Sequence, residues 1–264
     1  MSSNELSADE APILLAPAEV PADAADRLRQ ARVTLVGRMR NASNGTFLVR
    51  LDNPASDADD VGAESPPWGL AIYKPMRGER PLWDFEPGLF RREVAAYVLS
   101  EAMGIGAVPP TVVREDAPFG EGSLQWFVNA DFSHHYFSIM EEHPALVEQL
   151  QAIAAFDVVA NNTDRKGGHC LFDPVAERVW AIDNGLCFAV SFKLRTVIWE
   201  FAGEPIPPAA LDAVRRVAAG APEDLAGLLT EAEIRAVERR ACQLVDMGVF
   251  PFDQSSHGYP WPLV

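Results

Sequence analysis

Short stretches rich in apolar residues, separated by turn-forming residues, recur in the first half of the chain, a pattern that is typical of strands. The pattern predicts strands over residues 33–35, 47–51, 68–74, 108–113 and 123–128. Asn44-Gly45 separates the first two, and this pair is a strong hairpin signal because both residues tolerate positive φ. The first half of the chain is therefore expected to be rich in β-structure.

A spacing of three and four residues, typical of helices, dominates the second half. Leu146, Leu150, Ile153 and Phe156 mark one apolar helix face that runs into a polar loop. Thr230 and Glu233 form a capping box that predicts the start of another helix. One helix is also expected earlier, over residues 91–103. Together these elements predict an α+β fold.

The order of these elements predicts three regions. Residues 1–29 are rich in Ala, Pro, Asp and Glu without a clear period, which indicates a mobile acidic tail. Residues 30–128 are expected to form a β-rich N-terminal lobe, and residues 129–264 a helical C-terminal lobe.

The net charge and the number of cysteines limit the classes of function that the chain can have. A formal net charge of −16 over 264 residues leaves no basic stripe to neutralise phosphates, so we expect no nucleic-acid partner. No apolar run is long enough for an integral membrane segment, and three widely spaced cysteines are typical of reduced thiols. We therefore expect a cytoplasmic protein.

Two acidic residues stand in loops that suit phosphate chemistry. Asp164 lies in the polar stretch over residues 161–169, and Asp183 follows a short apolar run. Phosphoryl transfer needs one carboxylate to orient or deprotonate a hydroxyl and another to hold a metal ion against nucleotide phosphates. Ordinary turns explain both places as well: a helix C-terminus capped by Asn and Gly, and a type I′ turn at Asn184-Gly185.

The chain resembles the phosphatidylinositol 3- and 4-kinase-related proteins of actinobacteria and, more distantly, the HipA-like kinases. The resemblance covers residues 37–188 and rests on the motifs Tyr73-Lys74-Pro75, 78–85, Arg92-Glu93, 161–165 and Ile182-Asp183-Asn184-Gly185. It implies a bilobal protein-kinase-like fold. It also implies an ATP-dependent kinase that uses Mg²⁺ or Mn²⁺.

The resemblance assigns roles to residues of both lobes. In the β-rich lobe, Lys74 would contact phosphates with Glu93 fixing its direction, and the 41–45 turn would cover the phosphates. The nucleotide-binding residues expected there are Lys74, Glu93, Asn41, Ser43, Asn44, Gln125, Phe127 and Val128. The last three lie where the lobe connection contacts adenine. A solvated lysine, a plain hairpin turn and a buried strand are the alternatives.

In the helical lobe, the resemblance makes Asp164 the catalytic carboxylate, and Lys166 would neutralise the transferred phosphoryl group or help bind ATP. Asp183 would bind the metal ion. His169 is a departure, since related kinases place an Asn ligand there, and imidazole suits Mn²⁺ better than Mg²⁺. A histidine hydrogen-bonded within the loop is the alternative for His169.

Other polar residues are expected to be structural. Asp157 is expected to accept hydrogen bonds from backbone amides of the loop, and Arg165 to pair with a carboxylate. His134, His135 and His143 match no metal spacing with a cysteine pair and are taken as surface or core residues.

The leading hypothesis is a phosphotransferase that moves the γ-phosphate of ATP to a hydroxyl group. The acceptor would be an inositol-like polyol, a lipid head group or a protein Ser/Thr. A nucleotide-binding pseudokinase with a regulatory or scaffold role is the first alternative, and transfer of AMP is the second.

Overall fold

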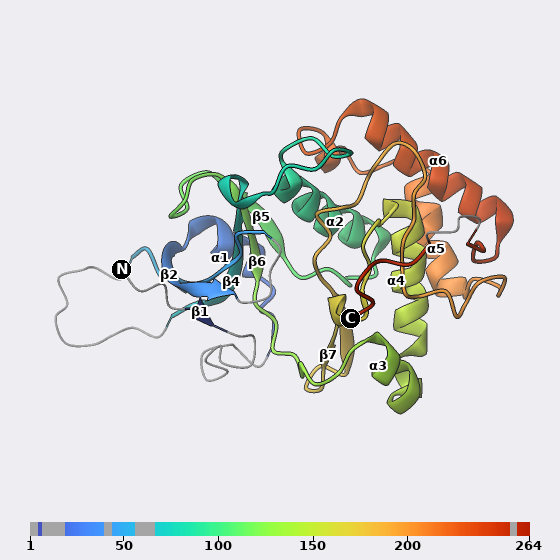
Figure 1. Cartoon of the computed structure of the whole chain (residues 1–264), viewed down its shortest axis with the longest axis horizontal. Helices are drawn as coiled ribbons and strands as arrows, with labels where there is room; N and C mark the ends of the chain where they lie inside the picture. Colours follow the sequence, from blue (N-terminus) through green and yellow to red (C-terminus); the bar gives the residue numbers. More distant parts are fainter. Residues whose placement is uncertain (1–4, 7–18, 40–43, 56–66, 254–257) are drawn as a thin grey trace. The chain divides into compact units, whose positions relative to one another are not determined.

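Figure 1 shows a computed structural model of the chain, which describes residues 5–6, 19–39, 44–55, 67–253 and 258–264. The described residues divide into two compact units, one made of residues 1–94 and 109–129 and the other of 95–108 and 130–264. The boundary differs from the expected lobes in one place, because residues 95–108 group with the helical unit.

The first unit is built on a six-stranded sheet in the order β1-β2-β3-β4-β6-β5. β1 pairs with β2 in parallel, and every other neighbouring pair is antiparallel. Its strands are β1 (Glu5–Leu6), β2 (Arg32–Met39), β3 (Phe47–Asp52), β4 (Gly69–Pro75), β5 (Thr111–Arg114) and β6 (Gly122–Trp126). The short apolar stretches thus predicted the main strands of this sheet.

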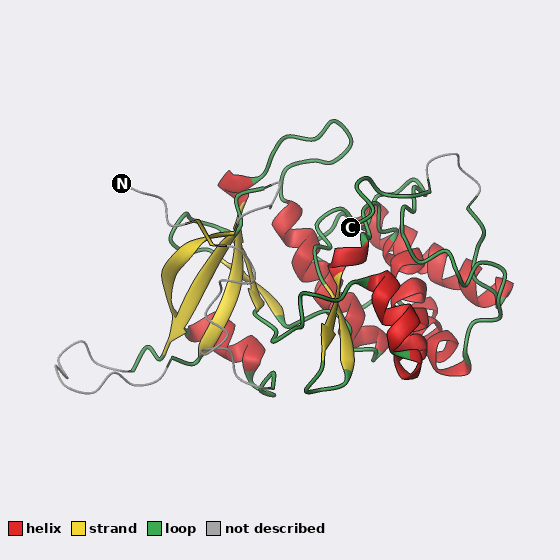
Figure 2. Cartoon of the chain, turned by 60° about the horizontal axis from the view of Figure 1, so that its bottom comes forward, coloured by secondary structure: helices red, strands yellow, loops and turns green. Residues whose placement is uncertain are grey.

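The acidic N-terminal region is not a mobile tail throughout. Residues 24–30 form helix α1 (Ala24–Gln30), which lies against the sheet (Figure 2). Ala24, Leu28 and Ala31 are buried in the core of this unit. Their spacing of four and three residues places them on one helix face, but two alanines and a leucine make a weak sequence signal.

The turn after β2 also differs from the expected one. β2 and β3 pair as antiparallel strands, yet neither Asn44 nor Gly45 has a positive φ. Gly45 instead donates its amide to the carbonyl of Gly78, which lies in the 3-10 helix η3 (Met76–Gly78). A Cβ on Gly78 would lie 2.9 Å from the Cα of Gly45, so close approach explains the glycine.

The second unit is mainly helical. Its elements are the second half of α2 (Leu89–Met103), α3 (Tyr136–Glu142), η4 (Pro144–Leu146), α4 (Val147–Ala160), η5 (Gly167–His169), α5 (Pro208–Ala218), η6 (Glu223–Leu225), α6 (Glu231–Met247) and a hairpin of β7 (Cys170–Asp173) and β8 (Arg178–Ala181). The predicted capping box starts α6, and Gly248 ends it with φ 64°.

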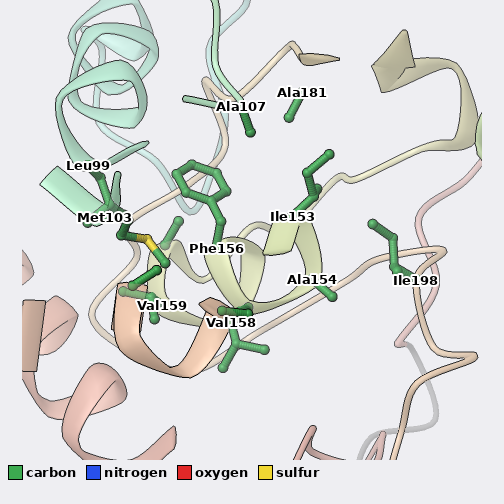
Figure 3. Packing of buried hydrophobic residues seen from close by; sticks show 14 of the residues in the cluster. Leu99, Met103, Ala107, Ile153, Ala154, Phe156, Val158, Val159, Ala181 and Ile198 are labelled. Atoms are coloured by element: carbon green, nitrogen blue, oxygen red, sulfur yellow. The ribbon is translucent and has the colours of Figure 1, made fainter. Parts of the chain in front are cut away.

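Helix α4 lies in the middle of this unit and carries the residues that lead into the polar loop. Phe156 and Val159 are fully buried and pack among Leu99, Met103 and Ala107 of the same unit (Figure 3). Nine residues of α4 are buried, so neighbouring elements fix the position of its C-terminal end. The chain therefore has the predicted α+β class, with a sheet-rich part and a helical part (Figure 2).

Candidate functional site

The polar loop begins where Asn161 ends α4 in a left-handed conformation, with φ 54° and ψ 56°. Asparagine is one of the few residues that adopt this conformation readily. Its side chain donates to the carbonyls of Ala189 and Ser191 at 2.9 and 2.8 Å and accepts from the amide of Lys193 at 2.9 Å. Asn161 therefore stops the helix and also ties the loop to residues 189–193.

A buried ion pair holds the middle of the loop. The guanidinium of Arg165 lies 3.0 Å from the carboxylate of Asp157 on α4, and neither side chain is exposed. Burial is the largest single influence and acts to lower the pKa of Arg165, but the charge and hydrogen bonds of Asp157, together with Cys170 and Cys187, raise it above its ordinary value. Arg165 therefore stays charged, and it pairs with a carboxylate as predicted.

The prediction for the hydrogen-bond donors to Asp157 is wrong in one respect. Its carboxylate accepts hydrogen bonds from the side chains of Asn162, at 3.0 Å, and Arg165. The sequence predicts backbone amides of the loop as donors, but the amide of Asn162 donates to the backbone carbonyl of Asp157 and not to its carboxylate. Side chains reach this carboxylate because the left-handed turn at Asn161 folds the loop back over the last turn of α4.

Arg165 also connects this loop to the second acidic loop. It donates to the side-chain oxygen of Asn184 at 2.7 Å and to the carbonyl of Ile182 at 2.8 Å. Asn184 is fully buried, and its amide donates to the carbonyl of Ala181. Sequence reasoning missed this role of Asn184, because nothing in the spacing indicates which of several polar side chains reaches a residue 19 positions away.

Asp164 presents a partly exposed carboxylate at the tip of the loop. Its side chain is 23% exposed and accepts a hydrogen bond from the ammonium of Lys166 at 2.9 Å. Its amide donates to the side-chain oxygen of Asn162, which fixes the backbone at this point. Burial raises the pKa of Asp164 above its ordinary value; the Lys166 ammonium opposes this rise, and the charge of Asp183 adds to it.

Asp183 is held in a left-handed conformation, with φ 58°. A non-glycine residue in this region carries backbone strain that the surrounding structure has to maintain. The left-handed residue is Asp183 itself and not Asn184, which argues against the type I′ turn. Its carboxylate is half-exposed and lies 3.3 Å from Nε2 of His169.

His169 is hydrogen-bonded within the loop and also faces Asp183. Its Nδ1 lies 3.0 Å from the carbonyl oxygen of Asp164 and 3.5 Å from the amide nitrogen of Lys166, and because the carbonyl contact is the shorter one we assign the ring proton to Nδ1. This assignment leaves the lone pair of Nε2 directed toward Asp183, which is the arrangement of a metal-binding histidine. Burial raises the pKa of the neighbouring Cys170 thiol to about 12, so this thiol is protonated at neutral pH.

The first unit contains an ion pair of its own. The ammonium of Lys74, on β4, donates to the carboxylate of Glu93, on α2. The Glu93 side chain is only 4% exposed and that of Lys74 is 21% exposed. β4 pairs with both β3 and β6, so Lys74 extends from a central strand. A central strand and a buried carboxylate therefore fix the direction of this lysine.

The other expected nucleotide-binding residues lie in different settings. Asn44 accepts a hydrogen bond from the amide of Arg80 at 3.0 Å, while Asn41 and Ser43 lie outside the described residues. Gln125 is buried in β6 and donates to Thr111, which fits the alternative of a buried strand. Phe127 donates its amide to Leu70, but the described residues supply no hydrogen-bond partner to the backbone of the buried Val128.

No family model matches the chain. Protein Rv2133c of Mycobacterium tuberculosis is 37% identical over 272 residues, a match that covers 89% of this chain and 93% of that protein. The chain belongs to the family of Rv2133c. The match spans nearly all of both proteins, so the family membership does not rest on a single motif.

Solved kinase structures share the fold of this Rv2133c relative. The Golgi casein kinase with Mn/ADP bound superposes with a TM-score of 0.55 at 15% identity, covering 92% of this chain and 80% of that one. Hydra Fam20 with sugar has a TM-score of 0.50 at 14% identity and covers 85% of this chain and 86% of that one. The Helicobacter pylori proinflammatory kinase CtkA has a TM-score of 0.50 at 11% identity and covers 84% and 94%. The chain therefore has a protein-kinase-like fold, as the resemblance implied.

No helix within the described residues is long and apolar enough to cross a membrane.

Proposed function

We propose that the protein is an ATP-dependent phosphotransferase that moves the γ-phosphate of ATP to a hydroxyl acceptor. The observation that carries this proposal is the buried network of Asp157, Arg165 and Asn184, which joins the loop of Asp164 to the loop of Asp183. A protein that used these loops only as turns would not need a fully buried charge pair to hold two partly exposed carboxylates.

Asp164 is assigned to the acceptor hydroxyl. Its raised pKa makes it a better proton acceptor than an ordinary aspartate, and its oxygen can orient the hydroxyl for attack. Lys166 already donates to this carboxylate, so its ammonium is in place to offset negative charge on the phosphoryl group.

Asp183 and His169 are assigned to a divalent metal ion. A carboxylate oxygen and an imidazole nitrogen 3.3 Å apart are a donor set that fits Mn²⁺, and the oxygen alone also suits Mg²⁺. When bound, the ion neutralises charge on the nucleotide phosphates. His169 keeps its Nε2 lone pair toward this position through its contact with the Asp164 carbonyl.

Lys74 and Glu93 are assigned to the nucleotide phosphates, because the buried carboxylate keeps the ammonium directed from the strand end. The backbone of Val128 is proposed to contact adenine, together with Phe127, while Asn41, Ser43 and Asn44 are proposed to cover the phosphates. The Golgi casein kinase with Mn/ADP bound shares the fold, which supports a nucleotide and a divalent ion here.

The chemical class of the phosphate acceptor is also part of this proposal. The motifs shared with actinobacterial phosphatidylinositol 3- and 4-kinase-related proteins favour an inositol-like polyol, its lipid form or a protein Ser/Thr. A net charge of −16 disfavours approach to an anionic membrane, so we rank a polyol or protein acceptor first. All three cysteines are free thiols, which is in line with a cytoplasmic location.

The experiment is a turnover assay with γ-labelled ATP, run with Mn²⁺, with Mg²⁺ and with chelator. The acceptors would be myo-inositol, phosphatidylinositol in detergent micelles and dephosphorylated casein. We expect metal-dependent ADP formation and label on one acceptor. Pyrophosphate as the product would show AMP transfer instead. Metal-dependent ATP binding without product from any acceptor would indicate the pseudokinase.

A further inference from the structure

Three metal-binding side chains meet beside helix α3, in a place that the phosphotransferase proposal does not use. His134 precedes the helix, Glu142 is its last residue and His143 follows it. One ring nitrogen of each histidine and one oxygen of Glu142 all lie within 4.8 Å of one another. These histidines match no metal spacing with a cysteine pair, because the third group is a carboxylate.

One pair of ligand atoms in this cluster already has the separation of two ligands on one ion. Nε2 of His134 lies 3.4 Å from an oxygen of Glu142. Two ligands about 2.1 Å from a tetrahedral zinc ion are about 3.4 Å apart. Two histidines and one glutamate form a common zinc ligand set, in which water or another ligand takes the fourth position.

A second carboxylate fixes the orientation of His134. Nδ1 of His134 lies 3.3 Å from the carboxylate of Asp131, so its Nε2 is directed away from Asp131 and toward Glu142. Asp131 is itself held, since it accepts from the amide and the hydroxyl of Ser133 at 2.9 and 2.6 Å. Zinc-binding histidines usually have this outer carboxylate on the second ring nitrogen.

His143 supplies the observation that points to a ligand. Its ring packs on Phe172 with centroids 4.2 Å apart, and it lies 5.2 Å from the ring of His134. Its Nε2 atom is buried and has no hydrogen-bond partner among the described residues. A buried polar nitrogen without a partner is uncommon in folded proteins, and a bound ion or water is the usual explanation.

We propose that His134, Glu142 and His143 bind one zinc ion, with Asp131 orienting His134. Imidazole nitrogens favour zinc over magnesium, so this site differs in chemistry from the one assigned to Asp183. The ion would join the segment before α3 to the C-terminal end of this helix, where the ring of His143 packs on Phe172 of β7. Its role is to stabilise the helical unit, not to take part in phosphoryl transfer.

The test is a titration with Zn²⁺ alone against a chromogenic chelator, using the full chain carrying Asp183→Asn so that the nucleotide-metal position does not contribute. We expect one equivalent of zinc to bind and the melting temperature to rise. His143→Gln and Glu142→Gln should each weaken binding at least about tenfold, and Asp131→Asn about 10- to 100-fold.

His135→Asn is the matched control. His135 neighbours His134 but accepts from the amide of Ser138 as the N-cap of α3, a role that asparagine also fills. Its zinc affinity should equal that of the parent. Glu142 is 58% exposed, so Glu142→Gln keeps the test valid even if His143→Gln fails to fold.

Two results would overturn the proposal. One is the absence of saturable zinc binding, which would leave His134 and Glu142 as an ordinary ion pair. The other is equal zinc affinity in the parent and in Glu142→Gln, or an equal loss in the His135→Asn control. Either result leaves the proposed phosphotransferase untouched, since none of these residues belongs to it.

Discussion

Arg165 and Asp157 form an ion pair 3.0 Å apart in which neither side chain has any exposed surface. The same guanidinium bonds Asn184, beside Asp183. Asp164 directly precedes Arg165 in the chain, so one buried side chain holds the residue after Asp164 and the residues on both sides of Asp183. Burying two charges costs free energy, so the presence of this pair is weak evidence that it stabilises the fold. It is better explained by a need to hold the two loops in a defined geometry.

Removing one partner of this pair should destabilise the protein. Arg165→Ala leaves Asp157 buried without its counter-charge, and we expect a loss of about 3–5 kcal/mol. Urea unfolding followed by tryptophan fluorescence measures it. Arg215→Ala breaks an exposed ion pair with Asp212 and is the control, with an expected change below about 1 kcal/mol. Equal effects of the two substitutions would contradict the role given to Arg165.

Asp164→Asn should abolish turnover and leave nucleotide binding largely intact. The amide keeps the shape of the side chain but cannot accept the proton of the acceptor, which costs about 10²- to 10⁴-fold in rate. Single-turnover kinetics and ATP titration separate the two effects. Asp212→Asn on the exposed face of α5 is the control. Unchanged turnover in Asp164→Asn would remove this residue from the mechanism.

The local pattern predicted those parts of the fold that depend on neighbours in sequence. The capping box of Thr230 and Glu233 starts α6, and the apolar stretch before Lys74 forms β4. The pairing of Lys74 with Glu93 was implied by the family resemblance and not by the local pattern.

The features that could not be predicted from the sequence depend on contacts between distant segments of the chain. The bond from Arg165 to Asn184 requires the turn at Asn161, and the position of Gly45 depends on Gly78. Helix α1 was missed because its apolar face is mostly alanine, which gives a weak hydrophobic pattern in the sequence. Packing against the sheet stabilises this helix, and that contact cannot be read from the local pattern.

Glu93→Gln should weaken ATP binding through Lys74. The neutral amide attracts the ammonium less, so Lys74 spends less time directed at the phosphates, and we expect a loss of at least about tenfold in kcat/KM. Glu101→Gln is the matched control, because Glu101 is an exposed glutamate on the same helix. Steady-state kinetics at varied ATP test both variants, and an equal effect of the two would reject Glu93 as the partner that matters.

His169→Asn should change the metal preference. An amide oxygen in place of Nε2 is a harder ligand, so the ratio of turnover with Mn²⁺ to turnover with Mg²⁺ should fall. Parallel assays with the two ions at saturating concentration measure the ratio. A ratio that stays at the parental value would show that His169 acts only within the loop, through its contact with Asp164.

The most direct test of the account is a calorimetric titration of ATP with Mn²⁺ or Mg²⁺ into the parent protein and into Asp183→Asn. We predict metal-dependent binding in the parent and a loss of at least about tenfold in the variant, because Asp183 supplies the carboxylate that holds the ion. Metal-dependent binding of equal strength in both proteins would contradict the role of Asp183. No binding to either protein would contradict the phosphotransferase itself.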